Sequence, residues 1–356
     1  MEFTAHGHPL HTRSLTLVVT QREDGRWCAR GDIIDLRKSS FVPMQDDLQP
    51  SGIVHQMSIE AAIDPATRRL EALETAQPFV AIEPGETSGG ECCRDPAPRL
   101  QALVGDTLDA GFAKRLDGVF GGQLGCSHLL TLFRLMASGL LRAFELEAAL
   151  SAKSKHPRRP GERPFRRAAF VDGFESPDES IELAVQLADI HTRPAAEVKL
   201  PLERLGDQAE VRILARLPQP GFSIARLRAG LRRRSAENFS DAEWQDVSSR
   251  LEELEGSSLT AGFARTLFAV VGQDPVDAPL LDALLQLAPG HIQVLAAISE
   301  RWLRAIASGG GAASLRSDGE APAVAALGGM PDSCYMWRSD GPLHAIRSTP
   351  PRRNQP

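Results

Sequence analysis

A cysteine and a histidine lie two residues apart in the stretch Gly125-Cys126-Ser127-His128, where a long apolar run predicts a helix from about residue 126. Backbone N–H groups at a helix N-terminus lack partners within the helix and carry a partial positive charge. A cysteine in that position is expected to have a lowered pKa and to be partly thiolate, the form that attacks electrophiles or binds metal. The same dipole favours neutral His128, the form of imidazole that binds metal. Buried free cysteines also serve as simple packing.

Other residues of the first 130 could join this pair. His55 lies near the start of a strand-like segment, and the adjacent cysteines Cys92 and Cys93 follow a Gly-rich loop. Imidazole and thiolate ligands suit zinc, iron or an iron–sulfur cluster. The spacing matches no standard zinc finger. A metal-site hypothesis therefore draws its ligands from five residues, His55, Cys92, Cys93, Cys126 and His128.

An enzyme acting on a small organic substrate is the second hypothesis. Cys126 would be its nucleophile or a ligand, a histidine its base, and Asp35 an orienting carboxylate. Two residues apart on one helix, Cys126 and His128 would point about 200° apart, which favours His55 as the base. The third hypothesis is a non-catalytic interaction or assembly protein, with a protein partner or a second copy docked on its long apolar helices. The chain shows no phosphate-binding Gly-rich loop, nucleophile elbow or His-Glu-x-x-His motif.

Composition narrows the class and compartment of the protein. The 356 residues are 42% hydrophobic and 24% charged, which is typical of a soluble globular protein. A net charge of −6 argues against nucleic acid as a partner. The five cysteines are an odd number in a long chain, so we expect reduced thiols in a cytoplasm. The first residues do not resemble a signal peptide, and charges interrupt the most apolar run, so no membrane contact is expected.

The order of patterns predicts strands first and helices afterwards. Asp24-Gly25 is a strong hairpin signal between two segments rich in β-formers. Four strands are expected over residues 15–21, 26–36, 53–63 and 70–75. Three helices are expected near residues 96–103, 107–120 and 126–150.

A sequence match within the chain predicts a duplication. Residues 103–139 align without a gap to residues 254–290, with 14 identities in 37 positions, against on the order of three by chance. We therefore expect an α+β fold built as a tandem pseudo-duplication, each half an antiparallel sheet of about 3–4 strands followed by helices. Cys126 aligns with Asp277 and His128 with Pro279, which indicates that the first copy is the functional one.

The same reasoning divides the chain into five parts. Residues 1–150 form an N-terminal domain with the candidate Cys/His site, and 167–306 form a degenerate second copy. The connecting stretches are a basic linker at 151–166 and a Gly/Ala/Ser-rich flexible linker at 307–329. Residues 330–356 combine an aromatic segment, expected to dock on the body, with a disordered tail.

The first half resembles an uncharacterised bacterial family, domain-of-unknown-function family 2889, over roughly residues 9–145. The residues that carry this resemblance are Asp24-Gly25, Asp32–Asp35, His55–Met57, Cys92-Cys93, Ala110–Phe112 and Gly125–Leu129. The family implies no established function.

A more distant similarity links the chain to iron–sulfur scaffold proteins of the IscU/NifU type. These have three strands followed by helices, and their ligands lie on a strand-end loop and at two helix starts. The corresponding positions of this chain hold His55, then Cys92 or Cys93, and then Cys126 with His128. The strand-end Cys and Asp of the scaffolds are not matched, so the similarity bears on the fold more than on cluster assembly.

Overall fold

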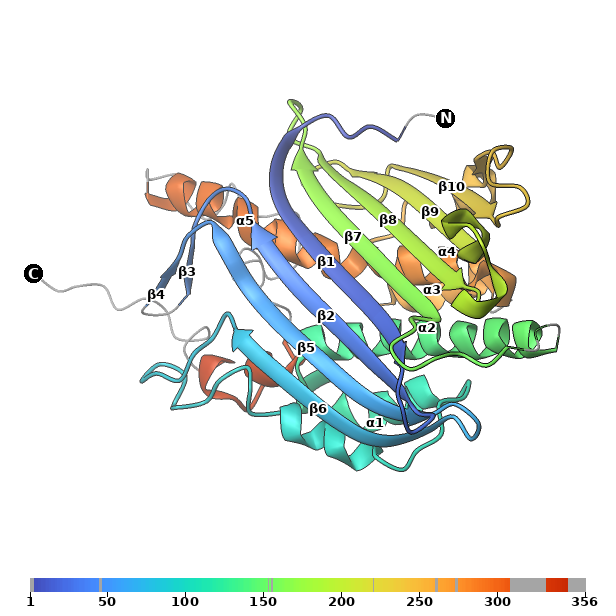
Figure 1. The fold of residues 1–356 in the computed structure, drawn as a ribbon. Helices are drawn as coiled ribbons and strands as arrows, with labels where there is room; N and C mark the ends of the chain where they lie inside the picture. The colour runs from blue at the N-terminus through green and yellow to red at the C-terminus, as the bar shows by residue number, and fades with distance from the viewer. Residues whose placement is uncertain are drawn as a thin grey trace, which may run out of the picture.

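The computed structural model of the chain describes residues 3–44, 47–152, 154, 156–219, 221–259, 262–272, 275–307 and 331–344. Its dominant feature is one nine-stranded sheet with the order β11-β10-β9-β8-β7-β1-β2-β5-β6 (Figure 1). All neighbouring strands run antiparallel. The strands are β1 (His8–Gln21), β2 (Trp27–Arg37), β5 (Gly52–Asp64), β6 (Arg69–Phe79), β7 (Phe165–Glu175), β8 (Ile181–Thr192), β9 (Leu205–Leu217), β10 (Arg226–Arg234) and β11 (Gln245–Asp246). A separate two-stranded sheet pairs β3 (Val42–Met44) with β4 (Asp47–Gln49).

The helices lie on one face of the large sheet, behind the strands in Figure 1. They are α1 (Phe112–Phe120), α2 (Ser127–Ser151), α3 (Phe263–Val271), α4 (Ala278–Leu285) and α5 (Leu287–Ala307). Short 3-10 turns are η1 (Ala97–Leu103), η2 (Gly122–Leu124), η3 (Ala195–Glu197), η4 (Pro201–Arg204), η5 (Ser248–Leu254), η6 (Pro275–Asp277) and η9 (Tyr335–Trp337). One continuous hydrophobic core fills the space between the sheet and these helices.

Alternation along the strands decides which side chains enter this core. In β1, Leu15, Leu17 and Val19 are fully buried, while the residues between them are half-buried on the opposite face. The hairpin predicted at Asp24-Gly25 is confirmed, since Gly25 adopts a φ of 84° and Asp24 Oδ1 accepts a hydrogen bond from the Arg26 N–H at 3.1 Å. The four strands predicted for the first part of the chain correspond to β1, β2, β5 and β6.

The predicted division into two halves, each with its own sheet, is wrong. β1 pairs with β7 in the middle of the sheet, with Leu15 opposite Ala169, so strands from both parts form one structure. Two separate sheets would each expose an edge strand with unpaired backbone groups, and the β1–β7 pairing removes both edges. Alternation reveals which face of a strand is buried but not which distant strand lies beside it. The match between residues 103–139 and 254–290 is thus not accompanied by two sheets.

Helix α2 crosses the buried face of the sheet at close range. It runs over β2 at Gly31, where an added Cβ would lie 2.4 Å from the Met136 sulfur. Side chains on several sides of α2 are buried, including Leu129, Phe133 and Leu140. This close approach fixes the first turn of α2, and therefore His128, above the end of the central strands.

The segments assigned to linkers and a tail are only partly described. Residues 308–330 and 345–356 lie outside the described residues, and with them nearly all of the predicted 307–329 linker and the end of the tail. Residues 331–344 pack on the body: the Tyr335 N–H donates to the Gly125 carbonyl at 2.8 Å, and Met336 is buried with Ile82 and Leu343.

Among the described residues, one stretch, Ala278–Ile298, is long and apolar enough to cross a membrane by length and composition alone. Core helices pass the same criterion, and 56% of its most apolar window is buried inside the protein. The stretch comprises α4 and the first half of α5, which contact the sheet.

A buried ion cluster joins α4 to the central strands. Arg167 on β7 donates to both carboxylate oxygens of Asp189 at 2.6 and 2.8 Å and to Asp282 on α4 at 2.6 Å. The Ser138 hydroxyl of α2 also donates to Asp282. Burial raises the pKa of Asp282, and the positive charge of Arg167 opposes that rise. One guanidinium therefore holds two buried carboxylates and ties helix to sheet.

We expect Arg167→Leu to lower the free energy of unfolding by about 3–5 kcal/mol, because it leaves buried Asp282 without its cation and Asp189 with only Arg142 at 3.3 Å. Urea unfolding would measure the loss. The matched control is Arg134→Leu, which removes a half-exposed pair with Asp117 and should cost less than about 1 kcal/mol. Equal losses in the two variants would show that the buried cluster has no special role in stability.

Candidate metal centre and adjoining cavity

Strand register brings three functional side chains into one row across the sheet. Arg13 on β1 is opposite Asp35 on β2, and Asp35 is opposite His55 on β5. All three point to the helix-covered face and are at most 4% exposed. The same face continues in apolar residues such as Leu15 and Ile33, so the row is a polar end of an otherwise hydrophobic surface.

Asp35 is the centre of this row and is fully buried. Arg13 donates two hydrogen bonds to it, from Nε to Oδ1 at 2.8 Å and from Nη2 to Oδ2 at 3.0 Å. Burial alone would raise the pKa of Asp35, but the charge of Arg13 and the adjacent imidazoles of His11 and His55 hold it well below the ordinary value. The carboxylate is therefore ionised, which is the form that binds a metal.

Three imidazoles surround the same carboxylate. His11 Nε2 lies 3.3 Å from Oδ1, while His55 Nδ1 and His128 Nε2 lie 3.3 and 3.4 Å from Oδ2. The His55 and His128 rings are in contact, with centroids 3.7 Å apart and planes tilted by 31°. His11 Nε2 and His55 Nδ1 are buried without an aligned hydrogen bond. Buried polar atoms are normally satisfied, so these two nitrogens call for a partner.

His128 lies in the first turn of helix α2, which packs on the sheet. The chain turns tightly before the helix at Gly125, where an added Cβ would lie 2.2 Å from the Phe120 carbonyl oxygen. Burial lowers the pKa of His128 well below its ordinary value, with the His55 and Arg13 charges adding to the effect. The Gln293 side-chain amide nitrogen on α5 lies 3.2 Å from His128 Nε2. Nε2 thus faces both the Gln293 amide and, at 3.4 Å, Asp35 Oδ2, and it can donate or accept there according to which ring nitrogen carries the proton.

Asp35, His55 and His128 have the separations of a metal-binding triad. Their candidate ligand atoms all lie within 4.8 Å of one another, and no other group of this kind occurs in the described part of the chain. Ligands bonded to zinc at about 2.0–2.2 Å in a tetrahedron stand about 3.4 Å apart. The 3.3 and 3.4 Å distances from Asp35 Oδ2 to the two imidazole nitrogens match that spacing. Two histidines and one carboxylate also form the donor set of non-haem iron sites.

Cys126 is not the thiolate predicted from its place before a helix. It is 5% exposed, and burial raises its pKa to about 12. The prediction fails because the loss of water destabilises the thiolate more than the helix dipole stabilises it. The predicted 200° separation from His128 is also wrong. Cys126 is the N-cap, outside the helical turn, and its sulfur lies 3.9 Å from His128 Nδ1.

The adjacent cysteines Cys92 and Cys93 have different surroundings in the structure. The Cys92 thiol is bound locally, 3.2 Å from Asp95 Oδ1. Cys93 lines the same cavity as His55, Cys126 and His128, together with Cys334 of the C-terminal segment. Burial and the neighbouring thiols raise the pKa of Cys93 well above its ordinary value. None of these thiols belongs to the triad of ligand atoms.

A cavity of about 300 Å³ opens beside the triad. Most of its wall is apolar, contributed by α5, by residues 333–337 and by Ile82. Its polar end is formed by Arg13, Arg37, Gln49 and the two histidines of the triad. A largely apolar cavity with a few convergent polar groups is the usual form of a small-molecule site.

Sequence reasoning missed His11, Arg13 and Arg37 as parts of this site. A usable signal existed: His11 and Arg13 share the parity of Leu15 and Leu17 along one strand. Polar residues that fall in phase with a buried apolar face are placed inside the protein by the strand period alone. Arg37 follows from the same rule, two residues beyond Asp35.

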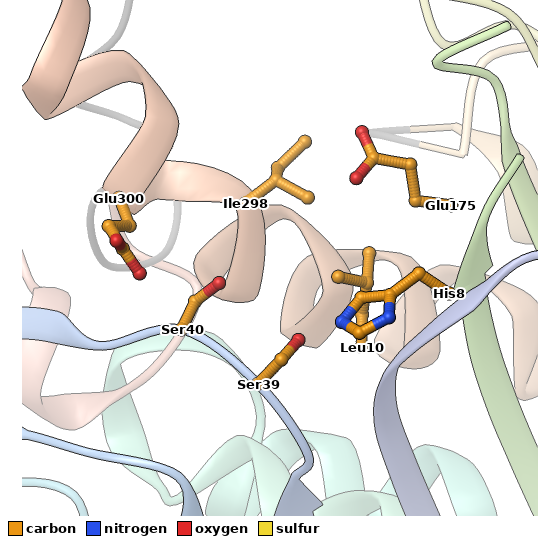
Figure 2. A pocket seen from close by; sticks show the side chains of 7 residues that line it. All are labelled: His8, Leu10, Ser39, Ser40, Glu175, Ile298 and Glu300. Carbon is orange, nitrogen blue, oxygen red and sulfur yellow. The ribbon is translucent and has the colours of Figure 1, made fainter. Parts of the chain in front are cut away.

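A second hollow, near the start of β1 at His8 and Leu10, lacks such a cluster. Its wall contains His8, Ser39, Ser40, Glu175 and Glu300 (Figure 2). The carboxylates of Glu175 and Glu300 lie on opposite sides of Ile298 in Figure 2. Their separation leaves His8 without a converging set of ligands, and among the described residues only the triad forms one.

Comparison with known proteins finds one family model that matches the first part of the chain. Residues 11–141 match the family model described as "Protein of unknown function (DUF2889)". The resemblance expected over roughly residues 9–145 is confirmed, and it brings no function with it. No curated protein and no solved structure matches the chain, so the expected similarity to IscU/NifU scaffolds is not shown.

His291, on α5 at the cavity wall, predicts a pH dependence of stability. Burial lowers its pKa from 6.5 to about 4, so the unfolded state binds the extra proton between these values. Stability from this residue is full above pH 6.5 and is lost as the pH falls toward 4. The loss is on the order of 3 kcal/mol at pH 4.

We expect His291→Leu to be less sensitive to acid than the wild type. Urea unfolding of both metal-free proteins at pH 7.5, 6, 5 and 4 would measure this. The free energy of wild type minus variant should decline steadily below pH 6.5. A constant difference over that range would show that His291 already titrates normally in the folded protein.

Proposed function

We propose that the protein binds a divalent transition metal ion, zinc or iron(II), at Asp35, His55 and His128, and presents it to a small organic molecule in the adjoining cavity. The single observation that carries this proposal is the placement of the three ligand atoms within 4.8 Å of one another. Three protein ligands leave a coordination position for water or substrate, as in catalytic rather than structural metal sites.

The groups around the triad support its use as a ligand set. Arg13 keeps Asp35 ionised and leaves lone pairs on Oδ2 for a metal. A metal ion bound at His128 Nε2, which lies 3.4 Å from the same oxygen, would require the ring proton on Nδ1. Cys126 sulfur then accepts the Nδ1 proton at 3.9 Å and holds the ring in that tautomer. Cys126 would thus be a positioning residue and not a ligand.

Contrast with the other buried Arg–Asp pair strengthens the assignment. Arg167 and Asp189 also face each other on neighbouring strands, and the remaining nitrogen of Arg167 is taken up by Asp282. Arg142 also lies 3.3 Å from Asp189, so two buried arginines face two buried carboxylates and the charges there balance, as expected of a structural element. Around Asp35, by contrast, three imidazoles crowd one carboxylate and two nitrogens lack an aligned partner.

A metal ion at this position would polarise an oxygen atom of a bound organic molecule or lower the pKa of a bound water. The cysteine-nucleophile alternative has less support, because the pKa of Cys126 is raised to about 12 and little thiolate would be present at neutral pH. Iron–sulfur assembly has less support as well, since Cys93 and Cys126 lie outside the triad.

Metal binding predicts a stabilisation that depends on both histidines. At a free ion concentration of 100 times its dissociation constant, the bound ion should add about 2.7 kcal/mol to the free energy of unfolding. We expect zinc or iron(II) to raise the melting temperature of the wild type but not of His55→Gln or His128→Gln. Elemental analysis of untagged protein should give about one metal ion per chain.

His191→Gln is the matched control, because His191 is equally buried but pairs with Glu147 away from the triad. It should retain the bound ion. Titration calorimetry on the folded variants separates lost binding from lost folding. Equal metal affinity in wild type, His55→Gln and His128→Gln would place the ion elsewhere and end the proposal.

A further inference from the structure

Arg37 is a buried cation that lacks an anionic partner among the described residues. It ends β2, is 4% exposed and lines the cavity. Its Nη1 donates to the Gln49 carbonyl at 3.0 Å, while its Nε has no hydrogen-bond partner. No described carboxylate lies within ion-pair distance of it, because Asp35, two residues earlier, is held by Arg13. A buried charge without a partner is costly, so its retention calls for a counter-ion.

Charge around the polar end of the cavity is unbalanced. Arg13 and Arg37 contribute two positive charges, and Asp35 contributes one negative charge, which leaves a surplus of one positive charge. His291, in the same cavity wall, has a pKa lowered to about 4 by burial and adds no charge at neutral pH. The described residues that line the cavity include no carboxylate to cancel this surplus. An anionic ligand would cancel it.

The remainder of the cavity is apolar and small. Ile82, Leu259, Ile292 and Leu295 belong to its wall, as do Met336 and Trp337 of the C-terminal segment. Its 300 Å³ equals the liquid volume of about ten water molecules. A compact organic molecule of roughly ten non-hydrogen atoms fits such a space.

We propose that the cavity binds a small monocarboxylic acid, with its carboxylate on Arg37 and its apolar body against α5 and residues 333–337. The guanidinium fork matches a carboxylate in shape, and the exclusion of water strengthens the pair. Arg37 and the triad lie at the same polar end of the cavity. The inference rests on the proposed metal function only in one respect, that atoms near the bound carboxylate face the metal ion.

Calorimetric titration with matched acids and amides tests the inference. The probes are hexanoate, benzoate and 3-phenylpropanoate, each compared with its primary amide, which has the same shape without the charge. Metal-stripped and zinc-loaded protein are titrated separately. We expect at least one acid to bind about tenfold or more tightly than its amide in both preparations.

Arg37→Gln should abolish the preference for acid over amide, and Arg37→Lys should keep part of it, since lysine retains the charge without the fork. The ratio is taken within one protein, so a reduced folded fraction does not alter it. Lys38→Gln is the control, because Lys38 is the next residue along, is exposed, and pairs with Asp172. That variant should keep the full preference.

Two results would overturn the inference: no acid preferred over its amide in the wild type, or a preference that persists in Arg37→Gln. Each differs from failure of the metal proposal. Protein that binds acids through Arg37 but takes up no metal contradicts only the metal centre. Protein that binds metal at the triad without an acid preference contradicts only the carboxylate site.

Discussion

The buried pair of Arg13 and Asp35 is the constraint on which the candidate site depends. A carboxylate with no solvent exposure must be compensated, and two hydrogen bonds from Arg13 keep it ionised. This arrangement requires β1 and β2 to pair in one register, with the two residues opposite each other. The same register places His55 beside Asp35 on the other side. An ionised, immobile carboxylate with imidazoles within 3.4 Å is therefore a direct consequence of strand pairing.

The single nine-stranded sheet provides the rigidity that this arrangement needs. β1 and β2 are interior strands, bordered by β7 and β5, so neither can slip without breaking ladders on both sides. Helices α2 and α5 then supply the parts that strands cannot, His128 from one helix and Gln293 and the apolar wall from the other. Residues 333–337 add the last side of the cavity, from a segment that is distant in the chain. The site thus unites side chains from several elements of one continuous core.

Local pattern predicted the four strands β1, β2, β5 and β6, the Asp24-Gly25 hairpin and the start of α2, because these follow from alternation, turn chemistry and helix periodicity. It failed at the β1–β7 pairing, where the decisive contact joins residues about 150 positions apart and leaves no local trace. Composition and spacing selected His55 and His128 as ligands and Asp35 as an orienting carboxylate, and the structure brings these three side chains together. The cysteines selected with them lie outside this group. Thiol reactivity depends on burial, which a sequence window around Cys126 does not reveal.

Cys126 illustrates how one position can carry two opposing effects. The helix start offers partial positive charge to a thiolate, whereas the surrounding core, including the Met57 sulfur at 3.9 Å, withdraws the water that a thiolate needs. Burial prevails and the sulfur stays protonated. A neutral sulfur beside His128 Nδ1 is still a weak acceptor, and it is the nearest described partner for that ring proton. The residue that first indicated chemistry is therefore a buried, protonated thiol, and it relates to the candidate site through its place beside the His128 imidazole and not through its own reactivity.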